Sequence, residues 1–390
     1  MIKMKISKDL LNELSMKIIS AIGKKRYQYF VHEPILSSSS NNHLMKCIHS
    51  NNVSSMGEYI QKFEEKLKKI TNSKYIVLTN TGTAALFIAL KRINVKDCEV
   101  LVPSMTFAAT SNAVIYNDGI PHYIDSCHDN QCLDIDKLSV YLERICIMKN
   151  NICYNKKSKR RIKSLVVVHA YGYMTDMSKL MKLCKKYNLK LLEDAAGALG
   201  SYYKNKHAGT FSDYGIISFN GNKIVTTGMG GALLLKNHTE YKEIKHIIST
   251  SRLQHPYEIE HDSVGYNLRM TNINAALGYS QLINFESTLK KKKKLYQRYL
   301  INLKESEICK VIDEKKFSSQ NHWINNLIIK DKYINNKKEI FEYLNSKGIQ
   351  CRAAWKPQHL LRMNLSHPRM KMENCIKLWK SIISLPSSYI

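Results

Sequence analysis

An acidic residue at the end of an apolar segment and a lysine in a small-residue loop are the residues of this 390-residue chain best suited to chemistry. Asp194 follows the apolar pair Leu191 and Leu192, where a strand of an open α/β sheet would present a side chain to a ligand. Lys223 ends the turn-rich sequence SFNGNK, which would fix its amine and leave it accessible. A carboxylate that keeps a pyridine nitrogen protonated and an amine that forms a Schiff base are what pyridoxal phosphate chemistry requires.

Two further segments could hold the phosphate group of such a cofactor. The turn at 79–83 precedes a helical segment, so its N–H groups and hydroxyls would face an anion at the positive end of that helix. Ser218 places another hydroxyl one loop before Lys223. The turn could also be only a capped helix start. Neither GxGxxG nor GxxxxGK[ST] occurs in these turns, which argues against dinucleotide and P-loop sites.

An aromatic side chain completes this set. Phe107 lies in LVPSMTFAATSNAV, just after an expected strand, where its ring could stack on a flat heterocycle, although a single phenylalanine is often a core residue. Taken singly, Asp194 could cap a helix and Lys223 could be a surface lysine. Together, the phosphate turn, aromatic ring, acid, serine and lysine follow one chain order that an α/β fold could bring to one place.

Strands that alternate with helices are expected to position these residues. Tyr75–Leu78 has strand character, a tight polar turn follows it, and Ala84–Leu90 continues as a helix. Similar strand-loop-helix units follow at 100–115, at 164–187 and from 189 onward. The alternation is typical of an α/β fold with a mostly parallel sheet that helices cover on both faces.

A second domain is expected near the C-terminus. From about Tyr241 the pattern becomes helical through Leu300 and is mixed afterwards. We therefore expect a large cofactor-binding domain at 1–240, which includes an N-terminal helical segment, and a smaller α+β domain at 241–390. The basic and polar segment 148–163 is interpreted as an exposed loop inserted between elements.

Composition narrows the class of protein. The apolar share of 44% is that of a globular chain, and no run of 18 apolar residues occurs. The N-terminus alternates charged and apolar residues where a signal peptide would have an apolar core, so we expect a cytoplasmic protein without a membrane partner. The ten cysteines show no CxxC and no paired metal spacing, which indicates reduced thiols and no metal site.

The net charge of +28 is the most unusual bulk property. It could reflect nucleic-acid binding, attraction to an anionic substrate, or the codon bias of an AT-rich genome. The clusters 156–163 and 290–294 lack interleaved aromatics, which favours a solvated surface. A positive surface would still speed the association of a nucleotide-diphosphate substrate. A basic nucleic-acid-binding or regulatory protein on a degenerate enzyme fold remains the alternative.

The chain resembles the DegT-type sugar aminotransferases, fold-type I pyridoxal phosphate enzymes that aminate keto groups of nucleotide-linked sugars. The resemblance runs from about His32 to Ser388. Its most specific pieces are NVSSMGEYIQKFEE, NTGTAALFIAL, VPSMTFAATSNAV, VVVHAYGYMTDM, LLEDAA, SFNGNKIVTTGMGGA, HDSVGYNLRMTNINAALGYSQL and LPSS. SFNGNK and CRAAWKPQH are most similar to the branch that acts on UDP-4-keto-6-deoxy-N-acetylhexosamines in bacillosamine and legionaminic-acid type pathways. The resemblance implies glutamate as the amino donor.

The resemblance also implies roles for single residues. Lys223 would form the Schiff base with the cofactor and later move a proton between substrate and cofactor. Asp194 would pair with the pyridine nitrogen, and Phe107 would cover the ring. The cofactor phosphate would be bound by Gly82, Thr83 and Ser218.

Further residues would contact the substrate or a second subunit. Asn267 of the GYNLRM motif would reach the phosphate site of the neighbouring subunit, which implies a homodimer with shared active sites. Arg269 would lie nearby. The sugar nucleotide would contact Arg352, Trp355 and His359.

Two positions depart from the family pattern. Relatives usually have Gln or Glu three residues beyond the aspartate, in contact with the ring hydroxyl of the cofactor, whereas this chain has Gly197. We expect that contact to be missing or supplied by another group. Relatives also continue through a further helix after LPSS, so we expect a shorter small domain. Related deoxygenating dehydratases have histidine in place of the lysine, so Lys223 argues against that reaction.

Overall fold

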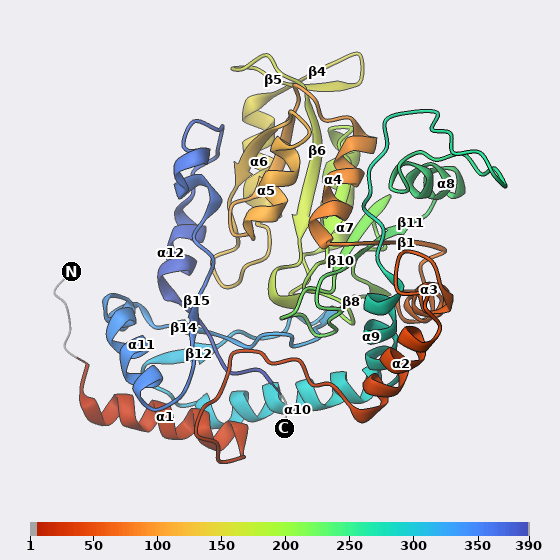
Figure 1. Cartoon of the computed structure of the whole chain (residues 1–390). Coiled ribbons are helices and arrows are strands. Elements are labelled where there is room, and N and C mark those ends of the chain that lie inside the picture. The colour runs from red at the N-terminus through yellow and green to blue at the C-terminus, as the bar shows by residue number, and fades with distance from the viewer. Residues whose placement is uncertain (1–5, 389–390) are drawn as a thin grey trace.

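A seven-stranded sheet forms the centre of the chain in the computed structural model, which describes residues 6–388 (Figure 1). Strand β11 is antiparallel to both of its neighbours, and the pairs from β10 to β3 are parallel. The predicted α/β class with a mostly parallel sheet, that of fold type I, is confirmed. In spatial order the strands are β1 (Tyr75–Thr79), β11 (Gly231–Leu235), β10 (Tyr214–Ser218), β7 (Lys190–Asp194), β6 (Ile162–Val168), β2 (Glu99–Pro103) and β3 (Ile120–Ile124).

Helices pack against this sheet and extend beyond it (Figure 1). Polar N-caps begin several of them; Thr81, for example, accepts a hydrogen bond from the N–H of Ala84 at the start of α4. The helices are α1 (Lys8–Ile22), α2 (Ser38–His49), α3 (Glu58–Thr71), α4 (Gly82–Ile93), α5 (Ala108–Ile115), α6 (Ile135–Ile145), α7 (Met177–Lys186), α8 (His238–Ile247), α9 (Asn272–Ile283), α10 (Phe285–Leu303), α11 (Lys337–Ser346) and α12 (Glu373–Ser381).

The central strands are buried because their side chains are apolar on both faces. Val100, Leu101 and Val102 of β2 are fully buried, as are the apolar residues at 165–167 of β6. Such continuous apolar runs are typical of parallel strands that are covered on both sides. The polar residues of the site therefore lie at the strand ends, where the apolar runs stop.

A second, four-stranded sheet lies in the C-terminal part of the chain, and its pairs are all antiparallel. Around it, helix α1 packs against α10 in an apolar core that also includes Leu14, Tyr299 and Leu327. The boundary expected near residue 240 stays a prediction, but α1 shares its core with the C-terminal part, and α9 packs on α3. The strands are β12 (Cys309–Val311), β14 (Asn326–Ile329), β16 (Ile382–Ser384) and β15 (Arg352–Ala353).

Two expectations about local structure are wrong. The segment 148–163 contains most of a β-hairpin, β4 (Cys146–Lys149) and β5 (Ile152–Asn155), because Asn150 and Asn151 both adopt the left-handed conformation that a two-residue turn requires. The helical pattern expected from Tyr241 to Leu300 is interrupted at 248–271, where the backbone forms bridges within the segment and one bridge to Thr79 at the end of β1. Within residues 6–388, no helix has the length and apolar character needed to cross a membrane.

Candidate active site

One cavity of about 400 Å³ collects most of the residues predicted from the sequence. It lies at the ends of β7 and β10 and at the beginning of α4, and residues of the smaller sheet also line it. The predicted residues that line it are Gly82, Thr83, Phe107, Asp194, Ser218, Lys223, Arg352 and Trp355. Chain segments that are distant in sequence therefore meet at one place, as the order of motifs indicated.

Asp194 presents a fixed carboxylate to this cavity. It is the last residue of β7 and is only 5% exposed. One of its oxygens accepts a hydrogen bond from Thr110 Oγ1 at 2.7 Å, and the other accepts one from the N–H of Ala196 at 3.1 Å. These bonds orient the carboxylate and leave further lone pairs for a protonated ring nitrogen.

Lys223 lies in the loop that follows β10, with its side chain half-buried. Its Nζ is 4.0 Å from the centroid of the Trp323 ring. Burial lowers the pKa of Lys223 to about 8, while the carboxylate of Asp194 acts in the opposite direction. A lysine with this pKa is partly neutral near physiological pH, which suits an amine that must act as a nucleophile and a base.

The beginning of α4 forms an anion cradle. The first N–H groups of a helix have no partner within the helix, and here they belong to a segment that starts at Gly82 and Thr83. A Cβ atom at Gly82 would lie 2.9 Å from Cβ of Ser218, so glycine lets the helix end and the serine approach each other. The donors of this cradle fit a phosphate group, and binding of the cofactor phosphate by Gly82, Thr83 and Ser218 stays a prediction.

Aromatic rings form another wall of the cavity. Phe107, at the beginning of α5, is 60% exposed and meets Trp355 edge to face, with ring centroids 6.2 Å apart. Trp355 stacks on Tyr171 with centroids 4.3 Å apart. An exposed ring at this position is available to a planar ligand, which a core phenylalanine would not be.

The other predicted substrate contacts divide into two groups. Arg352 of β15 is exposed and lines the cavity. His359 lies outside it; its ring is 4% exposed, and its Nδ1 is 2.6 Å from Oγ of Ser104, directly after β2. The ring of His359 therefore packs against a strand end of the large sheet and does not line the cavity, and its contact with the substrate stays a prediction.

The GYNLRM motif passes beside the phosphate turn of its own chain. The N–H of Asn80 donates to the carbonyl of Leu268 at 2.8 Å, and Arg269 forms a backbone bridge with Thr79. Asn267 is exposed and does not line the cavity, and Arg269 does not line it either. Among the described residues, the buried Nε of Arg269 has no hydrogen-bond partner.

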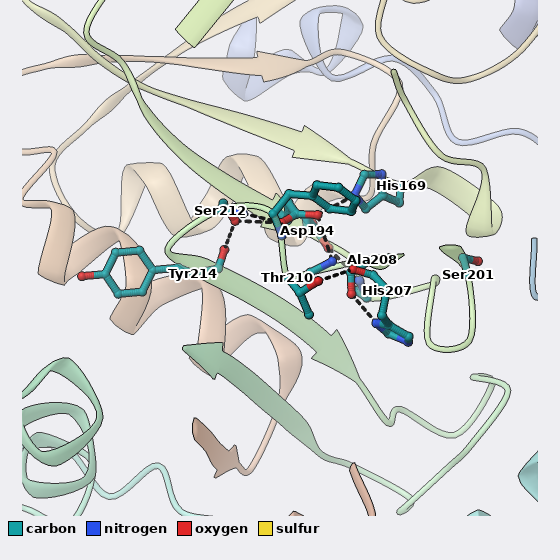
Figure 2. Close-up of polar contacts among 12 residues, drawn as sticks. His169, Asp194, Ser201, His207, Ala208, Thr210, Ser212 and Tyr214 are labelled. Atoms are coloured by element: carbon teal, nitrogen blue, oxygen red, sulfur yellow. Dashed lines mark hydrogen bonds and ion pairs between the residues drawn. The ribbon is translucent and has the colours of Figure 1, made fainter. Parts of the chain in front are cut away.

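A buried carboxylate that the sequence analysis missed supports the strand end behind Asp194. Glu193 is fully buried and accepts hydrogen bonds from His169 Nε2, from the N–H groups of Gly209, Phe211 and Ser212, and from the Ser212 hydroxyl, at 2.7–3.1 Å. Figure 2 shows His169 and Ser212 on either side of the end of β7 at Asp194. Burial raises the pKa of Glu193, but these donors outweigh burial and hold the pKa below its usual value.

Glu193 and Asp194 have different tasks because neighbouring residues of a strand point to opposite faces. Glu193 ties β7 to the loop at 209–212, while Asp194 is left to face the cavity. The sequence EDAA contained a signal for this pair, because two adjacent acidic residues directly follow an apolar strand segment. Three further lining residues, Thr110, Tyr171 and Trp323, were missed; the first two lie within motifs that had been identified, whereas nothing in the sequence placed Trp323 here.

Known proteins resemble the chain over most of its length. GDP-perosamine synthase of Escherichia coli O157:H7 is 31% identical over 334 residues, which cover 85% of this chain and 86% of that protein. UDP-4-amino-4,6-dideoxy-N-acetyl-beta-L-altrosamine transaminase of Campylobacter jejuni strain 81-176 is 29% identical and covers 85% of each chain.

Solved structures share the fold. Helicobacter pylori PseC, described as an aminotransferase involved in the biosynthesis of pseudoaminic acid, superposes with a TM-score of 0.83 over 92% of this chain and 93% of its own, at 24% identity. The family model for DegT/DnrJ/EryC1/StrS aminotransferases matches residues 34–389. The chain therefore belongs to this family of aminotransferases, which confirms pyridoxal 5′-phosphate as its cofactor.

Proposed function

We propose that this aminotransferase moves an amino group from glutamate to the keto carbon of a nucleotide-linked 4-keto-6-deoxy sugar in the cytoplasm. The product would be a 4-amino sugar for a surface glycan, and a UDP-linked N-acetylhexosamine is the substrate we favour. The observation that carries the proposal is the convergence of Lys223, Asp194 and the beginning of α4 on one cavity. The names of the relatives support a nucleotide sugar, with UDP in some names and GDP in others.

The residues of the cavity have separate chemical tasks. When bound, pyridoxal phosphate supplies an aldehyde to which amines bond and a ring that takes up electrons. Lys223 would supply the amine that holds it, and its Nζ, when free, would be placed to accept a proton and return it. Asp194 would keep the ring nitrogen protonated through a charge-assisted hydrogen bond, a kind of bond that contributes about 1.5–3 kcal/mol.

The mouth of the cavity suits an anionic substrate. Arg352 is exposed there, and a guanidinium can bind two phosphate oxygens at once. The net charge of +28 would increase the rate at which a nucleotide diphosphate associates, more than it would increase the final affinity. Arg352 would therefore select for the diphosphate, while the aromatic wall of Phe107 and Trp355 faces the cofactor and sugar.

A homodimer is part of the proposal. Asn267 is exposed and lies outside the cavity of its own chain, as expected of a residue that acts in a neighbouring subunit. The segment 248–271, which extends between α8 and α9 at the edge of the molecule (Figure 1), exposes Tyr257 by 82% and Val264 by 87%. Ile259 in the same segment is 73% exposed, and several large apolar side chains exposed on one segment are expected of a surface that a partner covers.

Product analysis tests the proposed reaction. The purified protein is incubated with glutamate and with UDP-, GDP- and dTDP-linked 4-keto-6-deoxy sugars, and products are identified by mass and NMR. We expect a 4-amino sugar, formed fastest from a UDP-linked N-acetylhexosamine. Faster conversion of a GDP-linked sugar would contradict the assignment of the nucleotide, and no amination of any sugar would contradict the proposed function.

Removing the amine tests the role of Lys223. Lys223→Ala should lower kcat/KM by at least about 10⁴-fold, because the variant loses both the covalent attachment and the base. Lys242→Ala, at an exposed position on α8, is the matched control and should leave the rate unchanged. Normal turnover by Lys223→Ala would exclude the proposed mechanism.

A further inference from the structure

Gly197 and Trp323 compete for the same space in the wall of the cavity. A Cβ atom at Gly197 would lie 2.8 Å from both Cε3 and Cζ3 of the Trp323 ring, closer than such atoms approach each other. The indole is only 2% exposed, so it has little freedom to move aside. A side chain at position 197 and an indole at position 323 therefore exclude each other.

A third residue locks this arrangement. The side-chain amide of Asn321 donates to the carbonyls of Gly197 and Leu199, both at 2.9 Å, and its Oδ1 accepts from the N–H of Trp323 at 3.0 Å. Asn321 is completely buried. The turn after Asp194 and the segment that carries Trp323 are thus joined by hydrogen bonds as well as by the close contact.

Trp323 also contacts the lysine loop in two ways. Its Nε1–H donates to the carbonyl of Asn222, the residue before Lys223, at 2.7 Å. The face of its ring lies 4.0 Å from Nζ of Lys223. The hydrogen bond fixes the backbone next to Lys223, and the cation–π contact holds the lysine amine against the face of the indole.

We propose that Trp323 occupies the space that the absent side chain at Gly197 leaves and is the positioning residue of Lys223. It acts through the carbonyl of Asn222 and through the face of its indole. This inference rests on the proposed function of Lys223 and deepens it. It also gives the departure at Gly197 a physical meaning, since a glutamine at this position would need the volume of the indole.

The shared space is tested on the apoenzyme, without any cofactor. Gly197→Gln should lower Tm by roughly 5 °C, because overpacking a closed site is destabilising. Adding Trp323→Leu should restore most of that loss. Adding Trp355→Leu is the matched control; this residue also lines the cavity but is not among the atoms that a Cβ at Gly197 would meet, so it should restore nothing. If Tm recovers equally in both double variants, or in neither, then the side chains at positions 197 and 323 do not share this space.

The positioning role is tested with pyridoxal phosphate as the probe and without substrate. Apoenzyme is mixed with the cofactor, and the covalent bond to lysine is trapped with borohydride over time. Trp323→Leu should slow labelling about tenfold, since a displaced amine loses its alignment. Trp323→Phe keeps an aromatic face but loses the donor to Asn222, and it should lie between Trp323→Leu and the wild type.

A second background separates positioning from direct cofactor binding. In Lys223→Ala, which binds pyridoxal phosphate only noncovalently, adding Trp323→Leu should change Kd by less than about twofold. If Trp323→Leu lowers the affinity for pyridoxal phosphate equally in the wild type and in Lys223→Ala, the positioning role is overturned. If the wild type is labelled and Trp323→Leu is labelled at the same rate, the positioning role is also overturned, while the proposed function stands. A wild type that takes up no label would overturn both.

Discussion

The two ends of the cavity are built differently. At the inner end, Asp194 is 5% exposed and held by two hydrogen bonds, and Glu193 behind it is fully buried with all its donors in the same chain. At the mouth, Arg352 and its neighbour Ala353 on β15 are exposed. The inner end around Asp194 is thus organised by residues of its own chain before any ligand binds, whereas the mouth leaves its side chains open to groups from outside.

This contrast follows from where each end lies in the fold. The inner residues lie at the ends of buried parallel strands, where polar groups need partners because water does not reach them. The mouth residues lie on the exposed strand β15, where solvent satisfies their polar groups. We therefore expect changes at the inner end to affect stability and chemistry, and changes at the mouth to affect substrate binding.

The largest effect on stability is expected at Glu193. Glu193→Ala leaves His169 and the N–H groups of the loop without their acceptor, which should lower the free energy of unfolding by about 3–5 kcal/mol. Urea denaturation of the apoenzyme measures this loss. The matched change at the mouth, Arg352→Ala, should stay within about 0.5 kcal/mol of the wild type. Equal losses of unfolding free energy in Glu193→Ala and Arg352→Ala would contradict the difference between the two ends of the cavity.

The contribution of Glu193 should also depend on pH. Its pKa is lower in the folded protein than its usual value, so the folded state favours the charged carboxylate. The stability it provides is present above the unfolded-state pKa and is lost as the pH falls through the folded-state pKa. The difference in unfolding free energy between wild type and Glu193→Ala should therefore shrink in acid.

The next effect concerns the amine of Lys223. With a pKa of about 8, its neutral fraction should rise with pH and level off above that value. Covalent uptake of pyridoxal phosphate by the apoenzyme should therefore be about 100-fold slower at a pH two units below the pKa than on the plateau, because only the neutral amine is a nucleophile. Stopped-flow absorbance measures this rate. A midpoint near the ordinary value of 10.5 would show that burial does not tune this lysine.

A smaller effect is expected at Asp194. Asp194→Asn keeps the size of the side chain but loses the charge that holds the ring proton, so kcat should fall about 10- to 100-fold. KM for the sugar nucleotide should change little, because this residue lies away from the mouth. Steady-state kinetics with both substrates separate the two parameters. A change confined to KM would place Asp194 in substrate binding instead.

The smallest effect is expected at Arg352. Arg352→Ala should raise KM for the nucleotide sugar about tenfold and leave kcat for glutamate deamination unchanged, since one charge-assisted contact is lost. The effect should weaken as salt is added. Arg352→Lys should recover part of the affinity, because it keeps the positive charge but lacks the planar guanidinium that binds two phosphate oxygens at once. A variant that binds the sugar normally would remove Arg352 from the proposed pocket.

The inner end could be predicted from the sequence more completely than the mouth. Asp194, Ser218 and Lys223 follow local patterns, an apolar strand and then a polar loop, and parallel strands bring their ends together. The alternation of strands and helices gave the fold class for the same reason. His359 was placed by resemblance alone, and its ring lies against Ser104, just after β2, and outside the cavity.

Other features depend on contacts that no local pattern encodes. Trp323 reaches Gly197 and Asn222 only because the C-terminal part of the chain packs over the end of the large sheet. The hairpin at 146–155 was hidden by the basic run at 156–163 that follows it, although Asn150 and Asn151 are typical turn residues.

The central claim is that Lys223 is the amine that holds the cofactor in this cavity. The direct measurement is borohydride reduction of the full-length protein with pyridoxal phosphate, followed by proteolysis and mass spectrometry of the labelled peptide. The structure predicts a single stoichiometric label on Lys223, and its loss in Lys223→Ala. A label on another lysine, or none on the wild-type protein, would contradict the assignment.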